Sequence, residues 1–389
     1  MSRCGCWRAS RSAPPGVRTP SGLAADTAEV LCAAAAESLW SGPDLYDALA
    51  ARWPGLLAAG KRRRQALIQL HARLPLDIRP LSRRTHPRIA KAVALFALAD
   101  LRLGRLGLPG AESRAAAALE LLADSGAGTP AWGYPWDMQT RWSFYAKDSP
   151  NVVVTAFAIA ALSEGGRRER PEQAARWVQD ELWVDDLGVY GYHPGSRTVI
   201  HNATLLGARA AWLLRDSDPR VRPAVARAVE RTLRAQAPDG SFPYGEGAGL
   251  AWVDSFHTAY VLECLIDLEE VDGAIRPAVE RGLEYWREHF FDDRGRARLR
   301  PDRAYPEDAH SAGSALTALA RLDAAGLDTR ELIERVAERA ADAMVRGAHA
   351  IHRRYRWGAA RVTYVRWADA HMALGLANAA LALRSAEAP

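Results

Sequence analysis

The feature that most constrains the fold is a repeat, in which five polar, aromatic-rich loops each run into a helical segment of small residues. The predicted helices begin near residues 151, 202, 253, 308 and 366, so the repeat is about 50 to 60 residues long. One helical hairpin and its loop have this length, and regular repetition indicates a repeat architecture. Val, Ile and Tyr form no alternating runs, so no sheet is expected.

Two classes of helical segment alternate along the chain. The first is small or apolar on several faces and is expected to be buried nearly all round: residues 87–103, 151–163, 202–214, 253–268, 308–322 and 366–384. The second is amphipathic and is expected on the surface: residues 111–124, 171–182, 219–235, 273–288 and 328–346. A helix from the N-terminal cluster predicted at 27–38, 43–52 and 63–73 can supply a sixth outer member. The pattern therefore predicts an all-α fold, an (α/α)6 toroid, with an open superhelix of helical pairs as the competing arrangement.

Composition supports one large helical unit. The 389 residues are 49% hydrophobic, which is enough for a large core. We expect residues 1–25 to be a disordered basic tail, 26–85 to be helices that pack on the ring, and 86–389 to be the toroid that carries the function. The net charge of +5 is small and no single-sign block is long enough to indicate nucleic-acid binding, so no nucleic-acid partner is expected.

The cysteines and the apolar runs bear on location. The four cysteines form no paired Cys-x-x-Cys motif, so a disulfide framework and a zinc site are not expected, and a reduced cytoplasm is the default. Apolar runs stay shorter than the roughly 18 residues of a membrane span. No cofactor is predicted, and the oligomeric state stays open.

A closed ring would gather the long loops at one end. Inner helices run parallel in such a ring, so the loops at 125–150, 183–201, 236–252, 289–307 and 347–365 would all end at the same mouth. Long ordered loops are usually functional. Helix N-termini also favour an anionic ligand or transition state. The sequence therefore predicts that the site lies at this mouth.

Four histidines fall near the starts of inner helices, each beside a polar residue. The pairs are His201 with Asn202, His257 with Asp254, His310 with Asp308, and His371 with Asp369. A histidine near a helix N-terminus tends to be neutral and able to accept a proton, so His257 and His201 are candidate catalytic residues. Alternatively the three aspartates are helix N-caps, and each histidine bonds a loop carbonyl. The spacings match no metal-ligand motif, so no metal site is predicted.

The loops add aromatic and charged candidates. Aromatic faces beside hydrogen-bonding groups suit sugar rings or a carbocation, although the aromatics could merely plug the ring. Residues 132–151 contribute Tyr145 as a catalytic candidate and Trp136, Asp137, Gln139, Arg141, Trp142 and Asn151 as binding candidates. Later loops contribute Tyr244, Glu246, Trp252, Arg366 and Trp367. Glu246 and Asp254 form a candidate carboxylate pair or are two unrelated solvated acids. The basic, aromatic loop at 347–367 could hold uronate or diphosphate, or could be a solvated face.

Two resemblances follow from these motifs. Gln236-Ala-Pro-Asp-Gly-Ser-Phe242 with Trp252 resembles the Gln-x-x-Asp-Gly-Ser-Trp repeats of squalene-cyclase and prenyltransferase-type toroids, which implies the ring fold. The acid motif of class II terpenoid cyclases is missing, because Val153 stands where its acid would be, and the zinc ligands of the prenyltransferases have no match either.

A closer resemblance covers most of residues 75–385. The motifs at 132–141, 149–157, 201–208 and 252–260 are similar to a bacterial toroid family often encoded among surface-polysaccharide biosynthesis genes. That likeness implies a context and no mechanism. Polysaccharide lyases and uronyl epimerases on related toroids use Tyr, His, Asn and Arg, and this mouth has all four.

The leading hypothesis is a cytoplasmic enzyme that acts on an acidic or surface polysaccharide by general acid–base chemistry, like a lyase or an epimerase. Arg141 or Arg366 would neutralise a carboxylate, and His201, His257 or Tyr145 would transfer a proton. One alternative is an isoprenoid-handling toroid, with a lipid-linked saccharide as a possible substrate. It predicts an apolar, aromatic cavity with few buried charges. The other is a non-catalytic glycan-binding protein, which predicts no acid–base pair around a common point.

Overall fold

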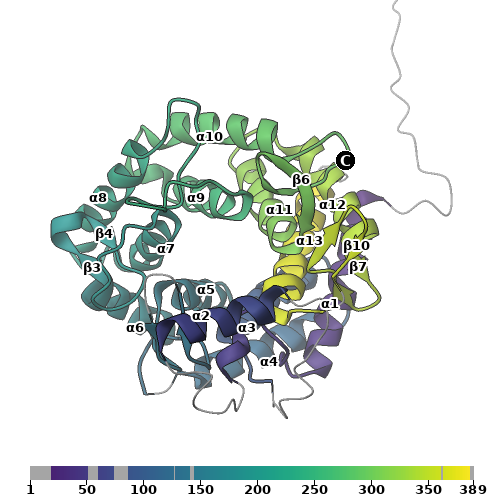
Figure 1. The fold of residues 1–389 in the computed structure, drawn as a ribbon, viewed down its shortest axis with the longest axis horizontal. Coiled ribbons are helices and arrows are strands. Elements are labelled where there is room, and N and C mark those ends of the chain that lie inside the picture. The colour runs from purple at the N-terminus through teal and green to yellow at the C-terminus, as the bar shows by residue number, and fades with distance from the viewer. Residues whose placement is uncertain are drawn as a thin grey trace, which may run out of the picture.

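A computed structural model describes residues 19–50, 60–73, 86–126, 128–140, 144–360 and 362–385. Its inner helices form a closed ring viewed end-on in Figure 1. They are α3 (Ala90–Arg105), α5 (Val152–Glu164), α7 (His201–Ala211), α9 (Ser255–Asp267), α11 (Ala309–Ala324) and α13 (His371–Arg384). Each packs against the next, and α13 packs against α3. The prediction of a closed toroid over an open superhelix is confirmed.

An outer layer of helices surrounds this ring (Figure 1). Its members are α1 (Pro20–Glu37), α4 (Ala111–Asp124), α6 (Glu169–Trp177), α8 (Val221–Arg234), α10 (Ile275–Phe290) and α12 (Arg330–Met344). Helix α1 packs against α12, α13 and α3, so it supplies the sixth outer position. Within the described residues, no helix combines the length and the apolar character needed to cross a bilayer.

The predicted end of the basic tail at residue 25 is wrong, because α1 already begins at Pro20. Thr19 caps this helix by accepting a hydrogen bond from the N–H of Gly22 at 3.2 Å, and proline suits the first helical turn. Residues 1–18 lie outside the described part of the chain. Of the other predicted N-terminal helices, the described part of 43–52 contains a 3₁₀ turn at Asp47–Ala50, and 63–73 corresponds to α2 (Lys61–Arg73).

Small residues allow the inner helices to approach closely. A Cβ atom on Gly313 of α11 would lie 2.2 Å from the carbonyl oxygen of His371, and one on Gly375 of α13 would lie 2.4 Å from that of Gly313. Any side chain at either position would force the two helices apart. This close approach brings the N-terminal residues of α11 and α13 together at the mouth.

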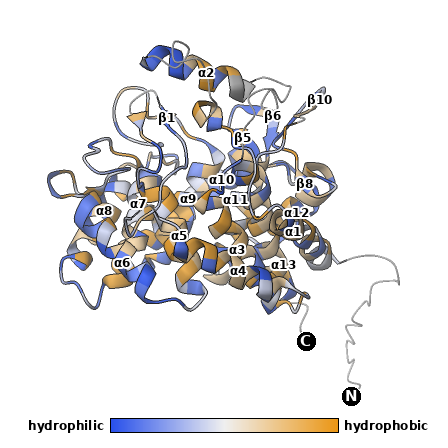
Figure 2. Ribbon diagram, turned by 90° about the horizontal axis from the view of Figure 1, so that it is seen from below, coloured by the Kyte–Doolittle hydropathy of each residue, from blue (hydrophilic) through white to orange (hydrophobic). Residues whose placement is uncertain are grey.

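The long loops and α2 lie on one side of the ring, as Figure 2 shows from the side. They contain short antiparallel strands that the sequence did not predict. These are β1 (Met138–Gln139), β2 (Phe144–Tyr145), β3 (Trp183–Val184), β4 (Val189–Tyr190), β5 (Arg298–Arg300), β6 (Arg303–Asp308), β7 (Val345–Arg346), β8 (His349–Ala350), β9 (Arg353–Tyr355) and β10 (Gly358–Ala359). One sheet joins two loops in the order β10-β9-β6-β5, with Asp308 opposite Arg353. Strands this short are held by cross-strand pairs and leave no alternating pattern to detect.

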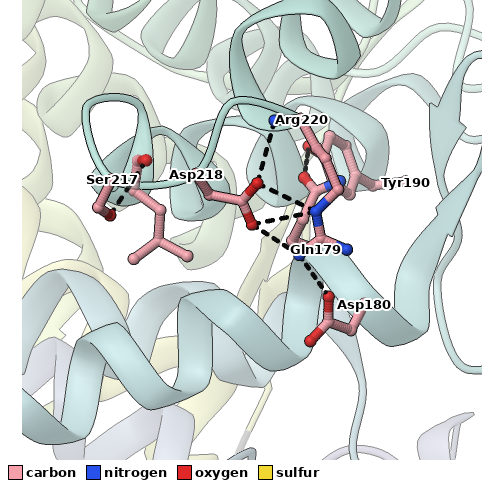
Figure 3. A network of polar contacts seen from close by, with 7 residues as sticks. Gln179, Asp180, Tyr190, Ser217, Asp218 and Arg220 are labelled. Carbon is pink, nitrogen blue, oxygen red and sulfur yellow. Dashed lines mark hydrogen bonds and ion pairs between the residues drawn. The ribbon is translucent and has the colours of Figure 1, made fainter.

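A polar network fixes the outer rim near α8 (Figure 3). Arg220 binds its neighbour Asp218 through Nε at 3.0 Å and reaches Asp180 through Nη2 at 2.8 Å. Asp180 belongs to a π-helical segment (Val178–Leu182) that follows α6, and Tyr190 of β4 donates to Gln179 of that segment at 2.7 Å. These bonds tie α6, α8 and the β3–β4 hairpin together.

Candidate active site

A cavity of about 620 Å³ opens at the mouth where the inner helices begin. Its walls come from α2, the mouth loops and the first turns of the inner helices. A cavity of about 760 Å³ lies at the opposite end of the ring, where the inner helices finish. Its charged side chains are already paired, for example Arg209 with Glu263 at 2.7 Å and Arg321 with Asp267. The wall of the mouth cavity, in contrast, contains polar groups without partners in the part of the chain that the structure describes, so the mouth is the candidate site.

His257 and Asp254 form a hydrogen-bonded dyad in the wall of this cavity. Asp254 caps α9 by accepting from the backbone N–H of His257 at 2.9 Å. The same carboxylate lies 2.9 Å from Nδ1 of the imidazole, so Nδ1 carries the hydrogen and Nε2 remains for a ligand. Asp254 is thus both the N-cap and the group that orients the histidine.

Aromatic rings form a flat platform beside the dyad. Tyr244 and Trp252 are stacked, with centroids 4.2 Å apart and planes 12° apart, and both line the cavity. Tyr244 meets the His257 ring edge-on at 4.6 Å. A stacked pair of this size offers the face that a sugar ring requires.

A second polar cluster surrounds the hydroxyl of Tyr260. That oxygen lies 2.7 Å from Nε2 of His310, 3.3 Å from Nε2 of His371 and 3.3 Å from Nζ of Lys91. The two imidazoles stack at 3.9 Å because Gly313 lets their helices approach closely. Burial lowers the pKa of both histidines well below the ordinary range, and it raises the pKa of Tyr260. His310, which lines the cavity, is therefore a neutral base at pH 7.

Two members of this cluster, Lys91 and Tyr260, are absent from the residues predicted for the site. Lys91 is the second residue of α3, only 2% exposed, and it lines the cavity. A detectable signal existed, because α3 was expected to be buried on every face and lysine is almost never buried without a reason.

Three buried polar atoms in the cavity wall have no hydrogen-bond partner among the described residues. They are Oδ1 of Asn202, Nδ1 of His310 and Nε1 of Trp367. Buried polar atoms are nearly always paired, so these require a bound polar molecule or water. A ligand that offers both donors and acceptors, such as a polyhydroxylated one, would meet this need.

Arg366 also lines the cavity, but its charge is already neutralised. Its guanidinium makes two hydrogen bonds of 2.7 Å to Asp44, and both side chains are buried. Arg366 belongs to a π-helical segment (Val365–Ala370) ahead of α13, a type of distortion common at functional sites. Although burial opposes the charge, Asp44 outweighs it and the pKa of Arg366 is raised. The role of neutralising a substrate carboxylate, predicted for Arg366, is therefore disfavoured by this pairing.

Arg300 is the cavity arginine best placed for that role. Its guanidinium lies 4.8 Å above the Trp252 ring, and its Nη1 donates to the carbonyl of Val253 at 3.2 Å. In the described chain no carboxylate pairs with it, whereas Arg353 in the same wall is paired with Asp308 at 3.0 Å.

The structure brings only some of the predicted residues to this cavity. Besides those above, Gln139 lines it and accepts from Nη2 of Arg64 at 2.9 Å. Nine predicted residues do not line it: Trp136, Asp137, Tyr145, Asn151, His201, Glu246, Asp308, Asp369 and His371. Arg141 and Trp142 lie outside the described residues.

Several of these nine have local structural contacts. Asn151 and Asp308 cap α5 and α11, as predicted for Asp308. The prediction that Asp369 is an N-cap is wrong, because its carboxylate accepts instead from the N–H of Ala350 at 2.7 Å, and lies 3.1 Å from His349.

The other predicted residues outside the cavity have partners in α8 or in the loops. Glu246 binds Arg231 at 2.7 Å, away from Asp254, so the two do not form a carboxylate pair in the cavity. His201 lies 3.9 Å from Glu246. Asp137 accepts from the N–H of Lys147 at 2.7 Å, which fixes its loop. Trp136 stacks on Tyr134 at 5.8 Å.

Tyr145 packs behind the cavity wall. Its ring lies 5.5 Å from that of Tyr192, which lines the cavity, and 4.9 Å from that of His193.

Stability is expected to fall on mild acidification because of two buried histidines outside the cavity. Burial lowers the pKa of His201 and of His352 to about 4. The unfolded chain has the ordinary value near 6.5, so from about pH 6.5 to 4 the unfolded state binds more protons and stability falls as pH falls. We expect each to cost up to about 2 kcal/mol of unfolding free energy at pH 5 relative to pH 7.

Urea unfolding at pH 7 and pH 5 tests this expectation. The variant with His201→Asn and His352→Gln should lose less stability between the two pH values than the wild type. Part of the loss should remain, because His310 and His371 are also buried and neutral. An unchanged loss in the variant would contradict the assignment.

Comparisons with known proteins support the fold. No protein-family model matches the sequence, and no curated protein matches it. Among solved structures, an unsaturated glucuronyl hydrolase specific for heparin is similar, with a TM-score of 0.61 and 12% identity over 92% of this chain and 96% of the other. A cellobiose 2-epimerase from Bacillus thermoamylovorans B4167 has a TM-score of 0.57 and 12% identity over 75% of this chain and 87% of the other. A polysaccharide lyase has a TM-score of 0.58 and 8% identity over 95% of this chain and 99% of the other. At these identities the similarity concerns the fold, and it establishes that the chain is an (α/α)6 toroid.

Proposed function

We propose that the protein is an enzyme that transfers a proton at a carbon of a saccharide, in the manner of an epimerase, an isomerase or a lyase. One observation carries the proposal: the His257–Asp254 dyad and the His310–Tyr260 pair line the same cavity, beside an aromatic platform. The names of the similar structures, a glucuronyl hydrolase, an epimerase and a polysaccharide lyase, agree with a saccharide as substrate.

The cavity offers a role for each group. The sugar ring packs against the Tyr244–Trp252 platform and the Arg300 guanidinium, and its hydroxyls bond to the unpartnered atoms of Asn202 and Trp367. Nε2 of His257 removes a proton from the carbon next to a carbonyl or carboxylate, while Asp254 stabilises the imidazolium that forms. The Tyr260 hydroxyl donates its proton to the oxygen that gains charge, and His310 holds that hydroxyl in place.

An acidic saccharide would contact Arg300. We expect Arg300→Gln to weaken binding of a uronate-containing oligosaccharide roughly tenfold to a hundredfold, because a charge-assisted hydrogen bond contributes about 1.5–3 kcal/mol. Binding of a neutral oligosaccharide of the same length should change by less than about threefold. Titration calorimetry measures both affinities. The control is Arg303→Gln, since Arg303 is exposed in β6 and pairs with Asp302. An equal loss for both ligands would remove the role in charge recognition.

The isoprenoid alternative is less well supported. It predicts an apolar cavity with few buried charges, whereas the buried side chains of Asp254 and Arg366 line this cavity. A non-catalytic glycan-binding role predicts no acid–base pair around a common point, and here two such pairs line one cavity. A surface-polysaccharide context and a cytoplasmic location are parts of the proposal that rest on sequence motifs and cysteine usage, while a lipid-linked substrate belongs to the isoprenoid alternative.

Solvent exchange provides the direct test. The protein is incubated in deuterated buffer with neutral reducing oligosaccharides, uronate-containing oligosaccharides and, as a contrast, isoprenoid diphosphates. Proton NMR follows the loss of a C–H signal, and ultraviolet absorbance follows an unsaturated uronate. Exchange or unsaturation in a saccharide supports the proposal. Binding of the isoprenoid diphosphate alone would overturn the proposal in favour of the isoprenoid-handling alternative. Saccharide binding with neither exchange nor unsaturation would overturn it in favour of the non-catalytic glycan-binding alternative.

A further inference from the structure

Lys91 has an unusual environment for a lysine. Its Nζ lies 3.3 Å from the Tyr260 hydroxyl, 4.4 Å from the centroid of the Phe157 ring and 5.3 Å from that of the Tyr260 ring. Among the described residues, no carboxylate lies within ion-pair distance of this amine. A buried lysine normally has such a partner, because an isolated ammonium is costly to bury.

The surroundings favour the neutral amine. Desolvation lowers the pKa of Lys91 well below the ordinary range, and the nearby positive charge of Arg366 lowers it further, while Asp44 and Glu263 oppose the shift weakly. A neutral amine in an apolar pocket is the form of lysine that attacks carbonyl groups.

The amine lies at the floor of the cavity. Tyr260 and Phe157 each lie more than one turn inside their helices, α9 and α5, and their rings are 5.9 Å apart. Lys91 and Tyr260 line the mouth cavity, whereas Phe157 lines the cavity at the opposite end. A molecule that enters from the mouth therefore reaches Lys91 and Tyr260 last.

The composition makes a lysine at this position informative. The chain has 51 Lys plus Arg, and only Lys61, Lys91 and Lys147 are lysines. Arginine serves nearly everywhere else as the cation. A guanidinium stays protonated and does not attack carbonyls, so arginine could not replace a nucleophilic amine.

We propose that Lys91 is a covalent-catalysis site that binds the open-chain reducing end of a saccharide as an imine. This inference rests on the proposed function and narrows its substrate class to sugars with a free aldehyde or ketone. In this proposal the Lys91–Tyr260–His310 cluster forms the imine, and the His257–Asp254 dyad then removes the proton from the adjacent carbon.

The covalent step balances without a further reagent. The lone pair of Nζ adds to the carbonyl carbon, and the electron pair of the C=O bond moves to oxygen. Tyr260 gives its proton to that oxygen and takes one from the nitrogen, which leaves a carbinolamine. Tyr260 then gives its proton to the hydroxyl, the C–O bond breaks as water leaves, and the nitrogen lone pair forms the C=N bond, which leaves a protonated imine beside the Tyr260 phenolate. The protonated imine acidifies the adjacent C–H bond, which His257 can deprotonate. Hydrolysis by one water molecule returns the amine and the sugar.

Reductive trapping tests the proposal on the wild-type protein. The protein is incubated with cyanoborohydride and cellobiose, or with cellobiitol, the matched sugar alcohol that has no carbonyl group. Peptide mapping by mass spectrometry compares Lys91 with Lys61 and with Lys147, whose side chain is 65% exposed. We expect a saturable cellobiose adduct on Lys91, at least about tenfold above the level on the other two lysines, and none with the alcohol. Adducts confined to Lys61 and Lys147 would overturn the proposal.

Variants separate this inference from the proposed function. Lys91→Arg keeps a cation, whereas Lys91→Met keeps the length of the side chain without charge. We expect both to lose the adduct and at least 99% of carbon-bound proton exchange. If the wild type exchanges carbon-bound protons without a Lys91 adduct, and exchange persists in Lys91→Arg, the imine proposal is wrong. The acid–base proposal would then still hold. A Lys91 adduct without exchange would support the imine and remove the acid–base proposal. If the variants fail to fold, the wild-type peptide map decides.

Discussion

His257→Ala is expected to lower kcat/KM for the saccharide by at least about a thousandfold, in line with the loss of a general base. The imidazole is held by Asp254 through Nδ1, and only its Nε2 remains for the substrate. The backbone N–H of residue 257 still binds Asp254 after the substitution, so the cap of α9 and the fold should survive. Initial rates of proton exchange measure the loss, and circular dichroism checks the fold.

Two further variants sharpen the test. Asp254→Asn retains an N-cap but removes the charge that stabilises the imidazolium, so an intermediate loss of about a hundredfold is expected. His289→Ala is the matched control, because His289 lies in outer helix α10 and contacts Tyr285 instead of the cavity. If His257→Ala kept more than a tenth of the wild-type rate, His257 would not be the base, and the His310–Tyr260 pair would be the remaining candidate.

Asp44→Asn is expected to lower the free energy of unfolding by about 3–5 kcal/mol, because it leaves the charge of Arg366 buried without a counter-ion. Asp44 and Arg366 are 322 residues apart in sequence, and their two hydrogen bonds join the N-terminal segment to the segment that precedes α13. Urea unfolding monitored by tryptophan fluorescence measures the change.

The matched double variant distinguishes an unpaired charge from lost packing. Asp44→Leu combined with Arg366→Met removes both charges and should recover most of the stability, since apolar replacements of buried ion pairs are often neutral or stabilising. Arg197→Gln breaks the exposed pair with Asp186 and should have little measurable effect. A cost for Asp44→Asn no larger than that for Arg197→Gln would show that the buried pair does not stabilise the fold.

The ring and the location of its mouth could be predicted from the sequence because both follow from local patterns. Small, apolar residues on every face mark inner helices such as α5, and one-sided charge marks outer helices such as α12. N-capping was one of the two interpretations open for Asp254 and Asp308, because an N-cap is defined within four consecutive residues. The aromatic platform was also anticipated, since Tyr244 and Trp252 lie in one loop.

The contacts that decide the chemistry could not be predicted, because they join residues far apart in sequence. The Tyr260 cluster unites α3, α9, α11 and α13, and Lys91 lies 169 residues from the hydroxyl it contacts. The sequence around Arg366 does not reveal that its charge is neutralised, because its partner Asp44 lies far away in the chain. The short strands were missed because segments of two to six residues leave no alternating pattern, and one of the sheets also depends on pairing between two separate loops.

By itself, the sequence determined that this chain forms a repeat of inner and outer helices with a polar, aromatic loop ahead of each of five inner helices, because helix periodicity and repeat length are local properties of the chain. The tertiary structure decided that this repeat closes into a ring, since α13 packs against α3. Only the tertiary structure decided which of those polar groups are neutralised and which remain for a ligand. It paired Arg366 with Asp44 and left Lys91 without a carboxylate. Whether a polar group is neutralised depends on which residues lie beside it on the neighbouring inner helices. The separation of those residues is fixed by how closely helices such as α11 and α13 can pack.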